Sequence, residues 1–349
     1  MAAAFAPRFF LVLSLFYVLI DVAISRSRID AFETDRKPHN SSQNVSTSPT
    51  MKSSPDYMLR LLHRVTANPD ADQVQTGAVR GNLVYGITEN GGLSDRNFKF
   101  NVTIKKTKVL RFAELELYKL PSTLDENANS TVNIQIEDIY SGKRVSSQPV
   151  SMETTGWISF TIPLDIIRHW DRNPASNAGL AVHINESNMA PAIRFATRQT
   201  DPSLQLLLLL HCSDTENRFL EVLNVSFQAT LQQRHPRSVL ASHTGPCRRL
   251  DQIIHFKDLG WDDWVIAPRM FSAYHCAGAC QIPDVNKMKT NHARLQLFLS
   301  QQDSDLAAAP CCVPDKLGSI SMLYHGGPGE STYVLKQMND FVVKSCGCH

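Results

Sequence analysis

Cysteines are the residues of this chain whose number and spacing most directly suggest chemistry. The chain has 8 of them, and seven lie in its C-terminal third, at positions 247, 276, 280, 311, 312, 346 and 348. In a reducing compartment, the pairs at 276/280 and 346/348 would suit zinc. In an oxidising compartment, a short cysteine-dense segment forms a disulfide scaffold instead. The compartment therefore decides which chemistry these cysteines perform.

The N-terminal end predicts export. Arg8 is followed by an apolar run over residues 9–20 and then by small residues, which is the pattern of a signal peptide over residues 1–25. An uncleaved membrane anchor is the weaker alternative, because a span needs about 20 apolar residues. Sequons for N-glycosylation also indicate export; they lie at Asn40, Asn44, Asn101, Asn129, Asn185 and Asn224. We therefore expect a secreted, extracellular glycoprotein with disulfides.

The overall composition argues against two classes of function. With 35 basic and 33 acidic residues, the formal net charge is only +2, whereas nucleic-acid binding needs a concentrated basic surface. No Gly-x-Ser-x-Gly, His-Glu-x-x-His or phosphate-loop motif occurs. We expect no nucleic-acid partner, no catalytic residue, no metal and no cofactor.

The chain before the cysteine-rich end divides into three parts. Residues 26–54 are polar and lack periodicity, which predicts a flexible leader. Apolar residues at helical spacing predict an amphipathic helix at about 55–66. Short alternating runs then predict an antiparallel β region at about 80–230, with one helix near Leu164–Trp170. The runs are Phe98–Ile104, Val109–Tyr118, Val132–Ile136, Trp157–Ile162, Leu180–Ile184 and Leu204–Leu210.

A polar linker separates the β region from the cysteine-rich end and contains Arg234-x-x-Arg237. Two arginines at this spacing suit the acidic pockets of a secretory-pathway proprotein convertase. An ordinary charged linker is the alternative. Cleavage here would produce a propeptide of residues 26–237 and a mature part of residues 238–349.

The cysteine spacing is compatible with a small disulfide ring. Two disulfides between the segments 276–280 and 346–348 would close it, and each segment contains a glycine, Gly278 or Gly347. Because glycine has no β-carbon, a third disulfide could thread such a ring. Eight cysteines allow 105 pairings, however, so spacing alone leaves the connectivity open.

A resemblance to a known family supplies what the spacing leaves open. The segments that carry it are Gly260–Trp264, Cys-x-Gly-x-Cys at 276–280, Thr290–Ala293, Cys311-Cys312, Ile320–Tyr324 and the terminal Cys-Gly-Cys-His. Together they resemble the mature ligands of the transforming growth factor-β superfamily. Upstream, Leu110–Leu115, Gly156-Trp157 and Trp170 are similar to the family's propeptide. The chain lacks the additional N-terminal cysteine pair of the activin type, which places it with the bone morphogenetic protein branch.

The resemblance implies a fold and a set of disulfides. The mature part would be a small disulfide-rich β structure, a cystine-knot growth factor with two β-fingers and one helix, following a propeptide that is mainly antiparallel β with an N-terminal amphipathic helix. The implied bonds are Cys276–Cys346, Cys280–Cys348 and the threading bond Cys247–Cys312. Cys311 would then join two protomers. For Cys212, a buried apolar role and a mixed disulfide both remain open.

The resemblance also implies receptors and partners. Trp261, Trp264, Met322 and Phe341, with the loop 281–289, would form the surface for a type I serine/threonine kinase receptor, although simple finger packing would also explain the tryptophans. Ala267, Ser321, Leu323 and Leu335 would meet a type II receptor. A helix at Asn291–Gln301, with Thr290 as N-cap, would pack Leu295, Phe298 and Leu299 on the partner protomer.

The implied protein is a Smad-activating growth factor that works as a homodimer, or as a heterodimer with a related ligand, and that contacts its own propeptide. A Nodal- or activin-type ligand is the alternative within the family, and a cystine-knot antagonist is the alternative outside it.

Cleavage after Arg237 is testable with Arg237→Ala, because the convertase would read both arginines. Reducing gels of culture medium should lose the fragment of residues 238–349. That fragment from the wild type should not shift on deglycosidase treatment, since no sequon follows Arg237. An unchanged fragment from the variant would place the cut elsewhere.

Overall fold

The computed structural model describes residues 55–67, 79–91, 96–121, 131–185, 193–214, 245–281, 288–326 and 332–349. They all belong to one unit of the chain, Ser53–His349. The expected signal peptide, the leader and the linker with Arg234 and Arg237 lie outside these residues. Within them, no helix is long and apolar enough to cross a membrane.

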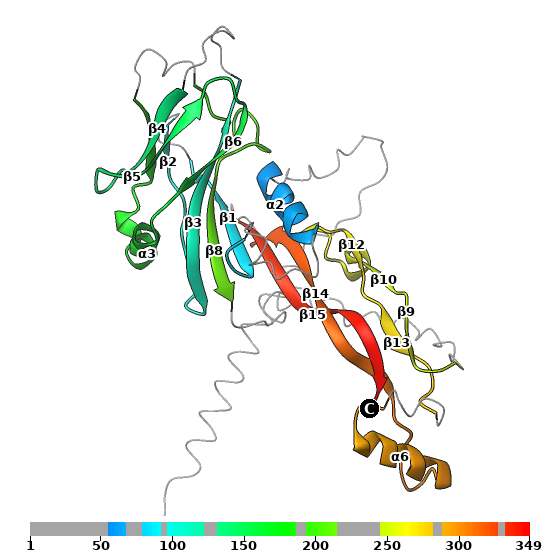
Figure 1. Ribbon diagram of the computed structural model, residues 1–349. Coiled ribbons are helices and arrows are strands. Elements are labelled where there is room, and N and C mark those ends of the chain that lie inside the picture. Colours follow the sequence, from blue (N-terminus) through cyan, green and yellow to red (C-terminus); the bar gives the residue numbers. More distant parts are fainter. Residues whose placement is uncertain are drawn as a thin grey trace, which may run out of the picture. The chain divides into compact units, whose positions relative to one another are not determined.

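A seven-stranded antiparallel sheet is the largest element of the structure (Figure 1). Its strands are β1 (Leu83–Thr88), β3 (Lys108–Lys119), β6 (Gly156–Thr161), β8 (Leu207–Asp214), β11 (Val265–Ala267), β14 (Cys312–His325) and β15 (Thr332–Cys348), in the spatial order β11-β14-β15-β1-β8-β3-β6. The pairing of β1 with β15 runs from Leu83 opposite Lys336 to Ile87 opposite Thr332. Strands that flank the expected cleavage linker therefore belong to one sheet.

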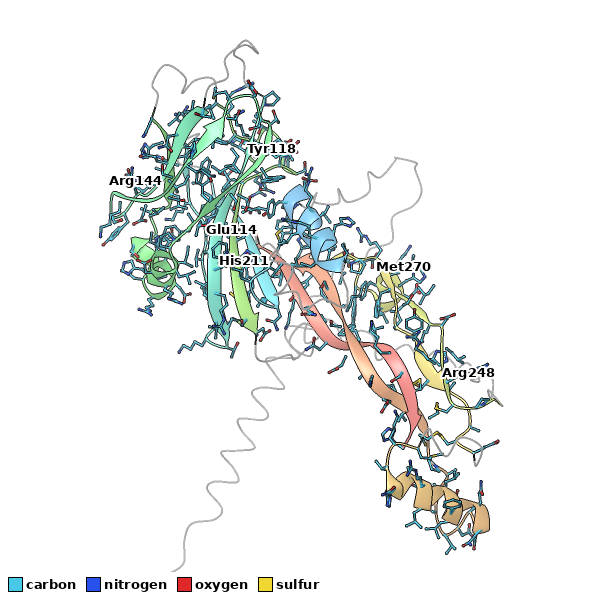
Figure 2. The ribbon with its side chains drawn as sticks, in the orientation of Figure 1. Glu114, Tyr118, Arg144, His211, Arg248 and Met270 are labelled. Atoms are coloured by element: carbon cyan, nitrogen blue, oxygen red, sulfur yellow. A yellow bond between two sulfur atoms is a disulfide. The ribbon has the colours of Figure 1, made fainter. Side chains whose placement is uncertain are left out.

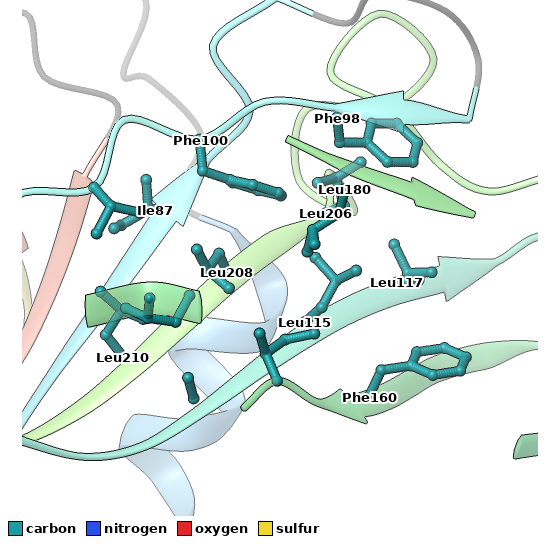
Figure 3. Packing of buried hydrophobic residues seen from close by; sticks show 14 of the residues in the cluster. Ile87, Phe98, Phe100, Leu115, Leu117, Phe160, Leu180, Leu206, Leu208 and Leu210 are labelled. Carbon is teal, nitrogen blue, oxygen red and sulfur yellow. The ribbon is translucent and has the colours of Figure 1, made fainter. Parts of the chain in front are cut away.

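A second sheet shares its core with the first. It contains β2 (Asn97–Phe98), β7 (Leu180–Ile184), β4 (Thr131–Asp138) and β5 (Lys143–Ser151), in that order. Alternate residues of β3, β4 and β8 point into one apolar cluster, in which Leu115, Ile134 and Leu208 are fully buried. Figure 3 shows Leu115 and Leu208 in this cluster. Helix α3 (Leu164–Arg172) adds Ile167 and Trp170 to this cluster, and a 3₁₀ turn, Pro174–Ser176, follows it.

Helix α2 (Asp56–Thr66) packs on the large sheet through a separate apolar cluster. Its buried residues are Met58, Leu61, Leu62 and Val65, which lie on one face at the spacing of an amphipathic helix. In the strand beneath, a β-carbon at Gly86 would lie 2.6 Å from the sulfur of Met58. A side chain at position 86 would therefore displace Met58.

The cysteine-rich end forms two fingers and one long helix. The first finger pairs β10 (Ile253–His255) with β12 (Met270–Ser272), and the second is the long hairpin β14–β15. Strand β9 (Arg248–Leu250) pairs with β13 (His275–Ala277) next to the first finger in the chain, and the 3₁₀ turn Phe256–Leu259 follows β10. Helix α6 (Asn291–Gln302) begins at Thr290, whose side chain accepts a hydrogen bond from the Ala293 amide at 3.1 Å. The expected N-cap is confirmed.

The structure corrects two expected strands and adds two that were not expected. The run Phe98–Ile104 is a strand only over β2, and the run Leu204–Leu210 is shifted to β8 because a turn hydrogen bond joins Leu204 to Asp201. Neither β1 nor β5 was expected. The sequence of β5 is mostly polar, and Gly86 interrupts β1, so neither carries a clear alternating pattern.

A buried carboxyl lies under the first helix. Glu116 on β3 is 1% exposed, and burial, with the neighbouring Glu114 carboxylate adding to it, raises its pKa to about 7. Hydrogen bonds from Ser159 and Tyr57 oppose this shift in part. Burial alone would also raise the pKa of Glu114, but the hydrogen bond and charge of His211 hold that pKa below its ordinary value. Figure 2 shows Glu114 and His211 on neighbouring strands. Nε2 of His211 lies 3.0 Å from Oε1 of Glu114.

Glu116 should make the chain less stable as pH rises. Its folded pKa lies above the ordinary value of 4.5, so its contribution is fully present below that value and is lost as pH rises through about 7. The free energy of unfolding should fall by up to roughly 1.4 kcal/mol per pH unit in this window. Urea unfolding of the uncut Arg237→Ala chain, with and without Glu116→Gln, measures the difference. Glu153→Gln, at an exposed position, is the control and should keep the wild-type slope.

Candidate receptor-binding surfaces and cystine knot

Three disulfides join six of the cysteines in the C-terminal part. Cys276–Cys346 and Cys280–Cys348 link β13 and the residue Cys280 after it to the end of β15, and Cys247–Cys312 is the third bond. These are the three pairs that the family resemblance implies. The first two bonds close a ring from the segments 276–280 and 346–348.

The two ring glycines have different surroundings. Gly278 has φ +121°, and a β-carbon there would lie 2.4 Å from the carbonyl oxygen of Pro246. The segment leading to Cys247 passes this point, since the Cys247 amide donates to Ala279 at 3.1 Å. A β-carbon at Gly347 would meet the flexible side chain of Lys289 instead. The steric requirement that we expected for both glycines therefore holds for Gly278 only.

The sulfurs of Cys247, Cys280 and Cys348 lie within 4.8 Å of one another, a grouping that would suit a metal. All three are in disulfides, however, so none can supply the thiolate that zinc binding requires. The zinc alternative does not fit these residues.

The two remaining cysteines have opposite environments. Cys212 on β8 is free and fully buried, and burial, with the Asp214 charge as a smaller cause, raises the pKa of its thiol to about 12. Cys311 is free and exposed. Its backbone exchanges two hydrogen bonds with His349, at 2.8 and 3.0 Å, which fix its position beside the knot. Cys311 is thus placed for a bond to another chain, whereas Cys212 is packed as a small apolar residue.

An aromatic cluster surrounds the two tryptophans of the first finger. Trp261 stacks on Phe256 at 5.7 Å between ring centroids and lies 5.5 Å from Trp264, which contacts Tyr324 edge-on at 5.7 Å. Both tryptophans are half-buried, so part of each ring remains at the surface. Met322 is fully buried, and Phe341 packs on Phe271 6.0 Å away. Met322 therefore supports this surface from below. Most of the loop 281–289 lies outside the described residues.

Three of the four residues that the resemblance assigns to a type II receptor pack in the apolar cluster of α2. Leu323 and Leu335 belong to the same apolar cluster as Met58 and Leu61, and Ala267 packs against it. Leu323 is 0% exposed and Ser321 is 7% exposed. The sequence had indicated the apolar face of this helix, but its spacing gave no sign of what the helix covers.

Helix α6 leaves its large apolar side chains uncovered. Leu295 is 55% exposed and Phe298 is 51% exposed, whereas Ala293 and Leu297 pack against the knot. Leu299 is half-buried. Helix α6 therefore has one buried apolar face and one exposed apolar face, and an exposed face of this kind suits packing on a second chain.

Of the predicted glycosylation sites, Asn101 and Asn185 are exposed in the structure. Asn40, Asn44, Asn129 and Asn224 lie outside the described residues.

Comparisons with known proteins cover both halves of the chain. The model for the transforming growth factor beta like domain matches residues 246–348, and the model for the TGF-beta propeptide matches residues 17–209. Bone morphogenetic protein 8A of Mus musculus is 28% identical over 343 residues, which cover 85% of this chain and 82% of that protein. Growth/differentiation factor 7 of Mus musculus is 46% identical over 103 residues, 29% of this chain and 22% of that protein. Growth/differentiation factor 6 of Rattus norvegicus is 40% identical over 126 residues, which cover 33% of this chain and 27% of that protein.

The position of Cys311 leads to a test of covalent dimerisation. Cys311→Ser should run as a monomer on non-reducing gels, because the other six cysteines of this part are used within the chain. The knot should survive, and the apolar face of α6 should still support a weaker dimer by mass action. Whatever depends on the dimer should therefore be lost first at low protein concentration, where the non-covalent dimer of the variant dissociates. A covalent dimer of the variant would mean that another cysteine forms the bridge.

Proposed function

We propose, since this chain belongs to the transforming growth factor-β family of signalling growth factors, that its C-terminal part signals as a disulfide-linked dimer. The dimer would bring type I and type II serine/threonine kinase receptors together and so activate Smad proteins. The chain is a ligand precursor, not an enzyme, and the relatives above belong to the bone morphogenetic protein branch.

The observation that carries this proposal is the exposure of one free thiol and two large apolar side chains on the C-terminal part. Cys311 is free and exposed, and Leu295 and Phe298 are each more than half exposed on α6. All three would be covered or bonded in a dimer. Two copies would also place the α6 of one protomer beside the Trp261/Trp264 cluster of the other, which would form a composite surface for a type I receptor.

The cover over the second finger supports a role for the propeptide. Leu323 and Leu335 would contact the type II receptor, but α2 occupies them in the uncut chain. One apolar surface cannot bind two partners at once. We therefore expect the type II receptor to displace α2, and the propeptide to compete with the receptor after a convertase has cut at Arg237.

Within the family, the ligand type decides which receptors and Smad class are activated. Within the branch, the sequence resembles anti-dorsalising morphogenetic protein, with Nodal as the alternative. Because these ligand types activate different Smad classes, the class that is phosphorylated separates a bone morphogenetic ligand from a Nodal- or activin-type ligand.

The test is to treat responsive cells with the purified dimer and to measure phosphorylation of both Smad classes. We expect the bone morphogenetic class to respond. Leu335→Asp should reduce the response by at least tenfold, because it places a charge on the proposed type II surface. This corresponds to a loss of roughly 1.4 kcal/mol or more in the free energy of receptor binding. Lys344→Glu, at an exposed position of the same strand, is the control. A protein that blocks the response to other ligands and gives none itself would be an antagonist.

A further inference from the structure

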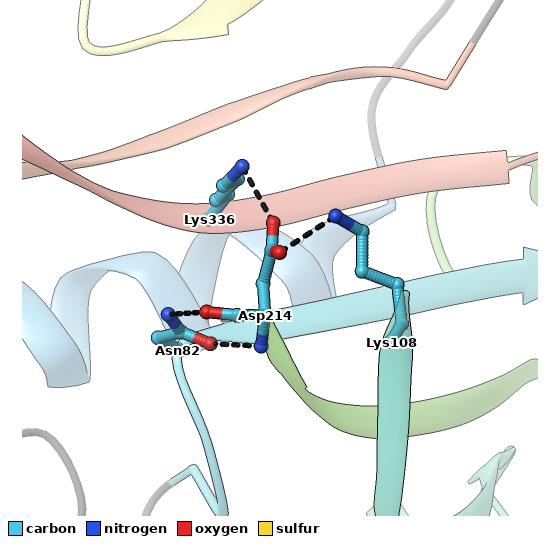
Figure 4. Close-up of polar contacts among 4 residues, drawn as sticks. All are labelled: Asn82, Lys108, Asp214 and Lys336. Atoms are coloured by element: carbon cyan, nitrogen blue, oxygen red, sulfur yellow. Dashed lines mark hydrogen bonds and ion pairs between the residues drawn. The ribbon is translucent and has the colours of Figure 1, made fainter. Parts of the chain in front are cut away.

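A lysine of the growth-factor part is buried where the two parts of the precursor meet. This contact, which we call the seam, consists of the pairing of β1 with β15 and the apolar cluster under α2. Lys336 lies on β15, opposite Leu83 of β1, and its side chain is 5% exposed. Its ammonium lies 2.8 Å from Oδ2 of Asp214, whose side chain is fully buried at the end of β8 (Figure 4). The ion pair thus joins a residue before the expected cleavage linker to a residue after it.

Asp214 has a second cation on the propeptide side. Lys108 of β3 donates to its Oδ1 at 2.6 Å, and the Lys108 side chain is 4% exposed. The three groups therefore form a buried cluster of two cations and one anion. Burial alone would raise the pKa of Asp214, but hydrogen bonds from Lys108 and Lys336 hold that pKa below its ordinary value. The carboxylate stays ionised.

The backbone around Asp214 is fixed by Asn82. The Asn82 side chain donates to the Asp214 carbonyl at 2.9 Å and accepts from the Asp214 amide at 2.7 Å. The carbonyl of Asn82 also accepts from the Gln337 amide at 3.0 Å, next to Lys336. The backbone of Asp214 is therefore fixed beside the part of β15 that carries Lys336.

Two other kinds of contact that the described residues make across the seam do not discriminate by charge. Backbone hydrogen bonds of β1 with β15 are open to any sequence, and the α2 cluster accepts any apolar residue of suitable size. Placing the wrong charge beside Asp214 is different, because a buried charge without a partner is strongly unfavourable. Of these contacts among the described residues, the cluster is the one that can distinguish one finger strand from another by its charge.

We propose that Asp214, positioned by Asn82 and paired with Lys108, is a specificity-determining site through which the propeptide recognises and retains growth-factor parts that carry a lysine opposite Leu83. The partner is the chain's own C-terminal part, or that of a related ligand with a cation at this position. This inference rests on the proposed cleavage, since recognition matters only when the two parts can separate.

A charge exchange tests it. Lys336→Glu leaves two buried carboxylates with one lysine, and Asp214→Lys leaves three buried lysines. Each should speed dissociation of the propeptide from the cut growth factor by about 100-fold or more. Because Asp214 contacts both Lys108 and Lys336, a full reversal must also invert Lys108. The triple variant Lys108→Glu, Asp214→Lys, Lys336→Glu again places one charge between two of the opposite sign, so it should recover to within about tenfold of the wild type, which is the pattern of coupled charges.

The experiment uses the full-length secreted chain, with an affinity tag on the propeptide and a site-specific protease sequence in place of residues 234–237. Cutting in vitro makes the measurement independent of the cell's convertase. Loss of processing in the unmodified chain would then count against the proposed cleavage, not against the ion pair. Retention of the C-terminal fragment on the tag resin is followed over time. Lys344→Glu on the same strand is the control and should retain the fragment as the wild type does.

Two results would overturn the proposal. Unchanged retention in both single variants would show that sheet pairing and α2 suffice. Weakened retention that the triple variant fails to restore would show that the cluster does not discriminate by charge. If a reversal variant is not secreted, the neutral variants Lys336→Met and Asp214→Asn decide the matter. Each should speed dissociation by about tenfold, and no change would refute the site.

Discussion

The pairing of β1 with β15 is the interaction on which the described structure depends. It joins the strands of the propeptide to the second finger of the growth factor in one sheet, with a register fixed from Leu83 to Ile87. The large core and the α2 cluster both contain residues from the two sides of this seam. The precursor therefore folds as a unit in which the propeptide supplies a sheet edge and an apolar cover that the growth factor lacks alone.

The growth factor compensates for its thin shape with covalent bonds. Its own small apolar cluster contains three of the six knot cysteines, together with Met288, Ala293 and Leu297. Such a segment has too little buried apolar surface to be stable by packing, and disulfides constrain its unfolded state instead. The knot holds the bases of both fingers, so the outer part of the second finger can pack against another element, here β1 and α2.

Apolar surface has two successive uses in this molecule. Leu323 and Leu335 stabilise the precursor while α2 covers them, and the same residues are proposed to meet a receptor later. The buried Asp214–Lys336 pair differs, because it contributes charge specificity at the seam more than net stability. Apolar contacts and charge thus have separate roles in holding and in recognising the growth factor.

The sequence by itself determined the class of this protein, because its signals are local or rest on exact residue types. The cysteine spacing with Gly278, the Thr290 cap and the helical spacing of α2 each follow from a few neighbouring residues, and the family resemblance supplied the disulfide pairs. Only the tertiary structure decided which surfaces meet. The strand β1, the cover of α2 over Leu323 and the pairing of Lys336 with Asp214 all join residues more than 100 positions apart. Such contacts leave no periodic pattern, since each partner alone has the sequence of an ordinary strand or helix residue.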